Sequence, residues 1–278
     1  MKKIAPQKSY EERRIAIDWD SLNFTNAYLF ATVMKNKQIC KGVLERLLGH
    51  TVSDFSYLEV EKTMDQGLLS KSVRLDVYVE SEADVAYNIE MQGQDTGELE
   101  KRIRYNRSMI DMETLEKGRS YRNLGESYVI FICKEDVFKR GQRRYTFRNT
   151  CEEVADLKLE DGTYILFFNT KGTKGKISKE LQALFDYIED GATDDLFIRQ
   201  LDKEVQKVKN SAKWRSDYMR HRDAKIDYIE KGRAEGKELG KVEATMELAK
   251  RFLALGNTVD DVARASNLPL DVVQSLVS

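Results

Sequence analysis

The stretch RLDVYVE-SEAD-VAYNIEMQ, residues 74–92, decides the fold because its side chains alternate between two faces. Apolar residues occupy every second position in both halves, at Leu75, Val77 and Val79 and then at Tyr87, Ile89 and Met91. A period of two predicts β-strands. The four residues between the halves, 81–84, suit a short hairpin loop. The sequence therefore predicts an antiparallel hairpin.

The register of this hairpin brings two acids together. If Glu80 pairs with Ala86, Asp76 stands opposite Glu90 on one face, with Cβ atoms roughly 5 Å apart. Gln92 joins the same face. Neighbouring carboxylates repel each other, and a bound divalent cation usually offsets this repulsion. Oxygen ligands of this kind suit Mg²⁺ or Mn²⁺. The alternative is a solvated face on which acids happen to be opposed, since a slip of one residue would separate them.

Composition narrows the class of protein. A length of 278 residues predicts one large domain or two modest ones. Hydrophobic residues make up 41% of the chain and charged residues 33%, enough to build a core. The net charge of −1 means that any basic surface for nucleic acid must be local.

Several classes are disfavoured by what the sequence lacks. The three cysteines form no CxxC pair and no disulfide framework, which fits a reducing cytoplasm. Two histidines give little support for a zinc site. The charged start has no apolar segment typical of a secretory signal. No apolar run approaches about 20 residues, the length of a membrane span. We expect a cytoplasmic protein without a membrane partner.

The order of elements predicts an α/β core, a central mixed sheet covered by helices. YVIFIC, 128–133, is a continuous apolar run that suits a strand buried on both faces. The remaining predicted elements are a helix over 26–48 ended by Gly49, a strand at 55–60, a helix over 98–115, strands at 145–148 and 164–168, and a helix over 178–188. The expected parts are a polar lead-in (1–20), the α/β domain (21–190), a charged helical linker (191–245) and a small helix-turn-helix-like module (246–278).

The linker and the module carry weaker signals. Gly232, Gly236 and Gly240 each cost a helix about 1 kcal/mol. They indicate a weak or hinged linker helix rather than a close helix–helix contact. In the module, Thr258 is a plausible N-cap and Pro269 suits the start of the last helix. That helix has no Lys or Arg. This favours a role in packing or oligomerisation over a role in DNA recognition.

Four segments together resemble a known family. RLDVYVE, NIEMQ, KRIRYNRSMID (101–111) and LEKGRSYRNLGESYVIFIC (115–133) resemble the Rpn family of recombination-promoting nucleases, a branch of the PD-(D/E)xK superfamily. The resemblance covers roughly residues 20–190. It implies a restriction-endonuclease-like core, αβββαβ, and a metal-dependent DNA endonuclease that hydrolyses phosphodiester bonds. It also implies a link to DNA recombination or mobile elements, as in transposases.

The resemblance also implies roles for the hairpin residues. Asp76 and Glu90 would hold Mg²⁺, with the carbonyl of Met91 nearby. Gln92 stands where the superfamily has a catalytic lysine, so it can orient a water but cannot lend charge. This departure leaves two readings: a nuclease that depends more on its metal, or a catalytically weak or inactive nuclease-fold protein that binds DNA or assembles.

An upstream acid completes the metal site in the superfamily. Glu45, on the first predicted helix, is the closest match to it, and Glu61 on the preceding strand competes. Glu45 also fits an ordinary solvated helix position.

Basic residues near the hairpin are candidates for DNA contact. On the helix over 98–115 they are Lys101, Arg102, Arg104 and Arg107, and Arg102 shares a helical face with Tyr105. FKRGQRRYTFR, 138–148, has five basic residues and no acid: Lys139, Arg140, Arg143, Arg144 and Arg148. We expect a hairpin tip that contacts DNA, or a charged loop that discourages edge pairing. Double-strand cutting by one site per chain predicts a homodimer.

Overall fold

The computed structural model describes residues 19–64, 73–92, 97–191 and 194–276. Its six strands are β1 (Phe55–Met64), β2 (Val73–Ser81), β3 (Ala86–Gln92), β4 (Ser127–Cys133), β5 (Arg144–Phe147) and β6 (Thr163–Asn169). Its α-helices are α2 (Ala27–Met34), α3 (Lys37–Leu48), α4 (Leu99–Thr114), α5 (Lys179–Ile188), α6 (Leu196–Lys209), α7 (Ala212–Ala254), α8 (Val259–Ser266) and α9 (Leu270–Ser275). The chain divides into two compact units, residues 1–215 and 216–278.

The strands of the first unit form one mixed sheet in the order β1-β2-β3-β4-β6-β5. β1, β2 and β3 are antiparallel, β4 and β6 run parallel to β3, and β5 closes the edge antiparallel to β6. Helix α4 connects the parallel neighbours β3 and β4. The side chains from Val129 to Ile132 are all fully buried, which confirms that YVIFIC is a strand covered on both faces.

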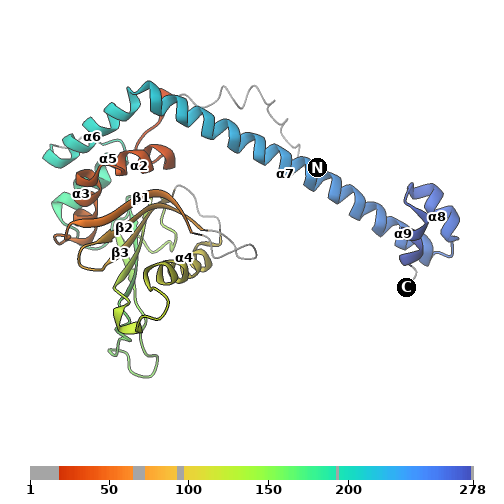
Figure 1. Cartoon of the computed structure of the whole chain (residues 1–278), viewed down its shortest axis with the longest axis horizontal. Helices are drawn as coiled ribbons and strands as arrows, with labels where there is room; N and C mark the ends of the chain where they lie inside the picture. The colour runs from red at the N-terminus through yellow and green to blue at the C-terminus, as the bar shows by residue number, and fades with distance from the viewer. Residues whose placement is uncertain (1–18, 65–72, 93–96, 192–193, 277–278) are drawn as a thin grey trace. The chain divides into compact units, whose positions relative to one another are not determined.

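Helices cover both faces of this sheet (Figure 1). On one face α4 packs into an apolar cluster that includes Ile103, Tyr78 and Phe131. On the other, Phe168 of β6 meets Phe185 of α5 edge-on, with ring centroids 6.4 Å apart. Helix α2 contacts β1 and β2. The predicted α/β core, a central mixed sheet covered by helices, is confirmed.

The helix predicted over 26–48 is two helices. Asn36 interrupts it because its side chain accepts from the backbone N–H groups of Gln38 and Ile39, an N-cap that starts α3. Asn26 caps α2 in the same way, through Leu29. Gly49 ends α3 as predicted, with φ 82°, a conformation that glycine adopts without strain.

The first unit extends past the expected boundary at residue 190. Helix α6 packs against it through four buried side chains, Ile198, Leu201, Val205 and Val208. Trp19 is buried and its Nε1 donates to the carbonyl of Lys209 at 2.8 Å. The end of the expected lead-in and the start of the expected linker are therefore parts of the domain. Residues 1–18 lie outside the described part.

The second unit contains most of α7, then α8 and α9. Ala249, Val262 and Val273 form its small buried cluster. Thr258 caps α8 by accepting from Asp261 N, as predicted. Helix α7 is continuous through Gly232, Gly236 and Gly240, and a Cβ added at any of the three would meet nothing within 4 Å.

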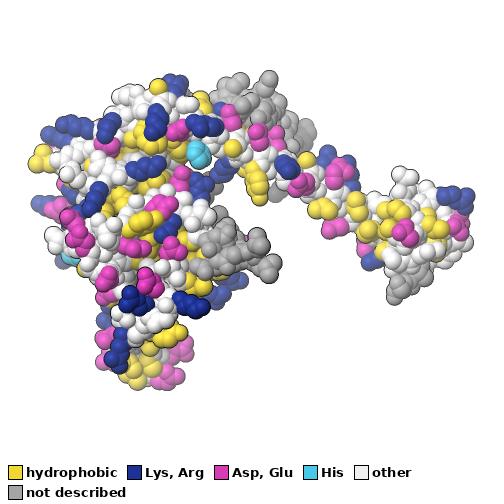
Figure 2. Space-filling view, in the orientation of Figure 1, with side chains coloured by type: hydrophobic (Ala, Val, Ile, Leu, Met, Phe, Trp, Pro, Cys, Tyr) yellow, Lys and Arg dark blue, Asp and Glu magenta, His cyan; other side chains and the backbone are white. Residues whose placement is uncertain are grey.

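The exposed surface of α7 is mixed in character. Figure 2 shows Lys and Arg, Asp and Glu, and apolar side chains along this helix. The exposed apolar residues include Leu239, Val242 and Leu248. Among the residues that the structure describes, no helix is both long enough and apolar enough to span a bilayer.

Candidate active site

The β2–β3 hairpin has the predicted register, since Glu80 pairs with Ala86 and Tyr78 with Asn88. Continuing this register puts Asp76 opposite Glu90. The two strands are tied together there, because Asp76 Oδ2 accepts from Met91 N at 3.0 Å. The structure therefore brings Asp76, Glu90 and Gln92 to one side of the hairpin.

Glu90 does not lie on a solvated face. Its exposed fraction is 7%, and its Oε1 is buried with no hydrogen-bond partner in the part of the chain that the structure describes. Burial is the main cause that raises the pKa of Glu90 to about 8, and the charge of Asp76 adds to it. The side chain of Asn88, the charge of Arg102 and the backbone of Asp76 oppose the rise. A buried carboxyl of this kind is neutral near pH 7 unless a cation compensates it.

Burial also raises the pKa of Asp76. The hydrogen bond from Met91 and the charges of Arg102 and Arg74 lower this pKa, whereas the charge of Glu61 raises it. Two interacting acids in such a site share their protons, so the titration belongs to the pair rather than to either residue. The pair is suited to exchange a proton for a metal ion.

Of the two candidates for an upstream acid, the structure brings only Glu61 within electrostatic reach of Asp76. Its carboxylate pairs with Arg74. Glu45 does not join the pair, because its Oε1 accepts from Val52 N at 3.0 Å and so braces the loop after α3. The described part of the chain contains no group of three or more His, Cys, Asp or Glu side chains placed to hold a metal.

The alternation of β1 side chains between the two faces of the sheet is interrupted at Glu61, whose backbone has φ 54°. Glu61 lies between the pairs Val60–Val77 and Lys62–Leu75, directly across from Asp76. Beyond it, Lys62 lies over Tyr57 and Tyr78, with Nζ 4.5 and 4.4 Å from their ring centroids. Tyr57 and Lys62 are five apart, so strict alternation would put them on opposite faces. The break in alternation therefore falls next to the acidic pair.

Arg102 of α4 reaches the end of β3, where its Nη2 donates to Gln92 Oε1 at 2.7 Å. Next to this contact is a pocket of about 470 Å³ whose lining includes Arg74, Lys101, Arg104 and Tyr105, the last 38% exposed. The structure thus gathers the predicted helix residues Arg102, Arg104 and Tyr105 around one pocket, and the charge of Arg102 acts on both Asp76 and Glu90. Arg107 turns away, with its Nη2 3.9 Å from Asp161 Oδ2.

The predicted hairpin tip at 139–144 is not a hairpin tip. β5 pairs with β6, so this segment crosses from β4 to the sheet edge rather than folding back on β4. Arg143 is used structurally: its Nε donates to Gly172 O at 3.1 Å and its Nη1 to Gly175 O at 3.2 Å. Arg144 lies over the Phe168 ring at 5.7 Å.

The segment nevertheless lies at the same end of the sheet as Gln92, because Gln92, Cys133 and Asn169 are aligned across β3, β4 and β6. Lys139 and Arg140 are exposed there. The loop after β6 adds exposed basic residues that were not predicted: Lys171, Lys174 and Lys176. The signal for them was available, since TKGTKGK directly follows a strand and precedes a helix. We call this the Gln92 end of the sheet.

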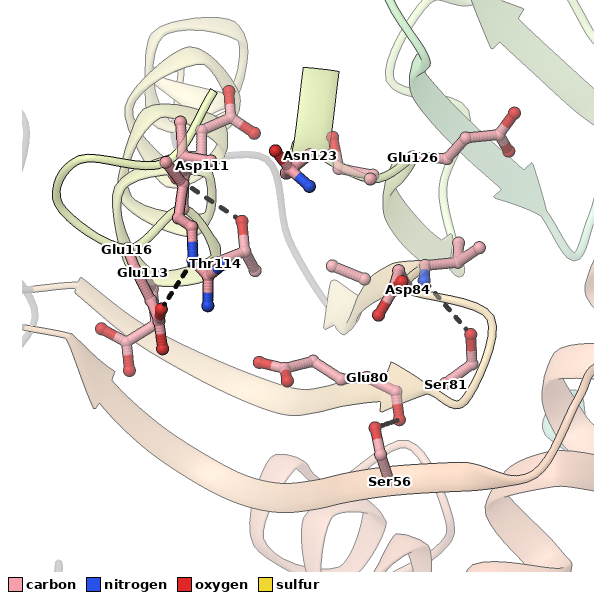
Figure 3. Close-up of a pocket in the computed structure, with 16 residues that line it drawn as sticks. Ser56, Glu80, Ser81, Asp84, Asp111, Glu113, Thr114, Glu116, Asn123 and Glu126 are labelled. Atoms are coloured by element: carbon pink, nitrogen blue, oxygen red, sulfur yellow. Dashed lines mark hydrogen bonds and ion pairs between the residues drawn. The ribbon is translucent and has the colours of Figure 1, made fainter. Parts of the chain in front are cut away.

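The opposite end is acidic. Figure 3 shows a pocket between the hairpin loop, the end of α4 and the segment before β4. It has a volume of about 510 Å³, and its lining acids are Glu80, Asp84, Asp111, Glu113, Glu116 and Glu126. Arg119 is the single Lys or Arg among the lining residues that are described, and it pairs with Glu116. A surface of this charge repels anions such as phosphates.

A mixed sheet with helices on both faces, which carries the buried Glu90 and the half-buried Asp76 on neighbouring strands, defines the chain as an α/β protein. The family model of PD-(D/E)XK nuclease family transposases matches residues 22–235. The chain belongs to this family, which indicates a nuclease- or transposase-related role with DNA as the substrate class. Neither a curated protein nor a solved structure matches the chain.

Proposed function

We propose that the chain is a metal-dependent DNA endonuclease that hydrolyses phosphodiester bonds during recombination or the movement of DNA elements. One observation carries the proposal: among the described residues no donor reaches the buried Oε1 of Glu90, which lies beside a second, half-buried acid, Asp76. An unpaired buried carboxylate is costly. A divalent cation removes that cost, and it is also what the chemistry needs.

Asp76 and Glu90 would hold the cation, with the carbonyl of Met91 as a further oxygen donor. All three donors are oxygens, which suits Mg²⁺ or Mn²⁺. When bound, such an ion makes a nucleophile of water at neutral pH and offsets charge on the phosphoryl oxygens. The cations that line the pocket next to the Arg102–Gln92 contact, among them Arg74 and Lys101, would neutralise the DNA backbone near the cleaved bond.

A plasmid assay tests this function. Supercoiled DNA is incubated with the protein in Mg²⁺, Mn²⁺, Ca²⁺ or EDTA. We expect nicked circles with Mg²⁺ or Mn²⁺ and none with EDTA. A homodimer would add linear product as both strands are cut. Equal binding with and without chelator, and no nick under any condition, would instead identify a nuclease-fold binding protein, an alternative that the neutral Gln92 favours.

We predict that the Gln92 end carries the phosphate contacts. Replacing Lys139 and Arg140 together with Ala should weaken DNA binding and make the slope of log K against log salt shallower by about 1–2, roughly one unit per lost contact. Fluorescence anisotropy at four salt concentrations measures this slope. Arg119→Ala, at the acidic end, is the matched control and should leave the slope unchanged.

Arg143→Ala should behave differently from that pair because its guanidinium holds two backbone carbonyls. We expect a lower melting temperature than in wild type, and a change in the salt-dependence slope that is smaller than in the Lys139/Arg140 variant. An unchanged slope in the Lys139/Arg140 variant would remove this segment from the DNA interface.

A further inference from the structure

One carboxylate, that of Asp136, organises the loop between β4 and β5. Its Oδ1 accepts from Phe138 N at 3.1 Å, and its Oδ2 accepts from Gly141 N at 2.6 Å. The hydroxyl of Tyr145 donates to the same carboxylate and lies 2.8 Å from each of its oxygens. The same hydroxyl accepts from Gln142 N at 3.2 Å. The chain therefore turns around a single acidic side chain.

This turn carries two exposed cations, Lys139 and Arg140. The backbone of Lys139 has φ 54°, a left-handed conformation that is uncommon for lysine and persists where the surroundings hold it. Lys139 N donates to Asp136 O at 3.2 Å, and Gly141 follows with φ 77°. The conformation of the backbone that presents both cations is thus fixed by contacts with Asp136.

The loop after β6 is fastened to this turn. Gly141 O accepts from both Thr173 N and Lys174 N, at 3.0 and 2.9 Å. A Cβ added at Gly172 would lie 2.7 Å from Arg143 Cα, so the two backbones are in direct contact there. The guanidinium of Arg143 adds its two hydrogen bonds to carbonyls of the same loop. The two loops are therefore held as one body.

Their contacts join five exposed cations into one surface, which we call the basic platform: Lys139, Arg140, Lys171, Lys174 and Lys176. We propose that Asp136 is a positioning residue for DNA, whose carboxylate holds the basic platform in a preformed arrangement for the phosphate backbone. Cations that are already in place lose less conformational freedom when they bind. The proposal rests on the endonuclease function proposed above, and it gives an acid a constructive part in binding a polyanion.

Electrostatics alone predicts the opposite effect for this acid. Burial would raise the pKa of Asp136, but hydrogen bonds from Gly141, Tyr145 and Phe138 hold that pKa below its usual value. The carboxylate is therefore charged at neutral pH and repels phosphate. If this charge were its whole contribution, neutralising it would strengthen DNA binding. If it positions the turn, the same change weakens binding, so the sign of the effect distinguishes the two.

Asp136→Asn tests the sign. Asparagine replaces one of the two accepting oxygens with an NH₂ group, which cannot accept a hydrogen bond from the backbone. We expect binding to a fluorescein-labelled DNA duplex in EDTA to weaken by about tenfold, and the slope of log K against log salt to become shallower by about 1–2. Fluorescence anisotropy at several salt concentrations measures both quantities. Binding as tight as that of wild type, or tighter, would overturn the proposal.

Glu135→Gln is the matched control, because Glu135 is the exposed neighbour of Asp136 in the chain. It removes the same charge from nearly the same place but leaves the turn and its carboxylate. It should bind the duplex as tightly as wild type or more tightly, with an unchanged slope. A loss of binding equal to that of Asp136→Asn would mean that the turn is not the cause.

A combined variant separates positioning from general destabilisation. Adding Asp136→Asn to the Lys139/Arg140 double-alanine variant should weaken binding by only about twofold, because the cations that the turn presents are already gone. All binding is measured well below the melting temperature of each variant. A full tenfold loss in this background would assign the effect to overall stability and overturn the proposal.

Tyr145→Phe removes one donor to the carboxylate and keeps the charge. It should weaken binding in the same direction by about threefold, and it carries the test if Asp136→Asn does not fold. Cleavage by wild type is assayed alongside. A wild type that binds the duplex but never cleaves it contradicts the endonuclease function alone. An active wild type whose Asp136 variant keeps its slope contradicts only the role of Asp136, and a wild type that does not bind the duplex contradicts both.

Discussion

Asp76→Asn is expected to reduce Mg²⁺-dependent nicking by on the order of 10³-fold, about 4 kcal/mol of transition-state free energy. The substitution removes one charge from the acidic pair and leaves the shape of the side chain. Asparagine still has an oxygen that can accept from Met91 N, the contact that ties β2 to β3. We therefore expect the fold to persist, with a melting temperature close to that of wild type.

The measurement is an initial rate of nicking on supercoiled plasmid, with melting curves and DNA binding in Ca²⁺ for each variant. Glu82→Gln is the matched control, because it removes one carboxylate from the loop of the same hairpin, where Glu82 is exposed. It should cleave at the wild-type rate. Cleavage by the Asp76 variant at that rate would show that the acidic pair is not the site of chemistry.

Glu90→Gln is expected to stabilise the metal-free protein at alkaline pH. The pKa of Glu90 is raised in the folded state to about 8, from an ordinary value of 4.5, first by burial and then by Asp76. The folded state therefore binds the proton more tightly than the unfolded state does. Stability from this group is complete below about pH 4.5 and is lost as the pH rises through about 8.

Glutamine removes this loss, so the free energy of unfolding of the variant should exceed that of wild type by a few kcal/mol at pH 9 and by little at pH 5. Urea denaturation in EDTA at both pH values measures the difference. Addition of Mg²⁺ should stabilise wild type more than the variant, since only wild type retains both ligands. Parallel pH curves for the two proteins would mean that Glu90 is not buried in its charged form.

The local parts of the fold were predictable from the sequence. Alternation over 74–92 and a four-residue loop fixed the hairpin and its register, because pairing between strands so close in the chain depends on local pattern and turn geometry. The continuous apolar run of β4 likewise predicted a central strand. Gly49 and Thr258 end or start helices through contacts with their immediate neighbours.

The rest depends on contacts between residues far apart in the chain. Nothing near β5 indicates that it pairs with β6 rather than β4, so the sequence predicts a hairpin tip for the basic segment before it. Arg143 is structural only because the loop after β6 supplies its carbonyl partners. Trp19 becomes a core residue because α6, nearly two hundred residues later, accepts its N–H. Asn36, by contrast, is a residue type that favours the N-cap position, so the break inside the predicted first helix could have been identified from the sequence.

The candidate site divides in the same way. Asp76, Glu90 and Gln92 follow from the register of one hairpin. Arg102 reaches them only because α4 crosses from β3 to β4 over the sheet. Glu61 comes near Asp76 because the pairing of β1 with β2 puts it directly across from Asp76, and Glu45, the sequence-based choice, is engaged elsewhere.

The opposed charges at the two ends of the β-strands give this unit an electric dipole along the strand direction. The chain as a whole carries a net charge of only −1, so monopole attraction cannot draw it to a polyanion. A dipole exerts a torque, however, so under the proposed function a duplex within a Debye length, roughly 10 Å at 0.1 M salt, would rotate the molecule until Lys139 and Arg140 face it. Encounters would then begin in the orientation proposed for cleavage, and added salt that screens this alignment would slow productive collisions.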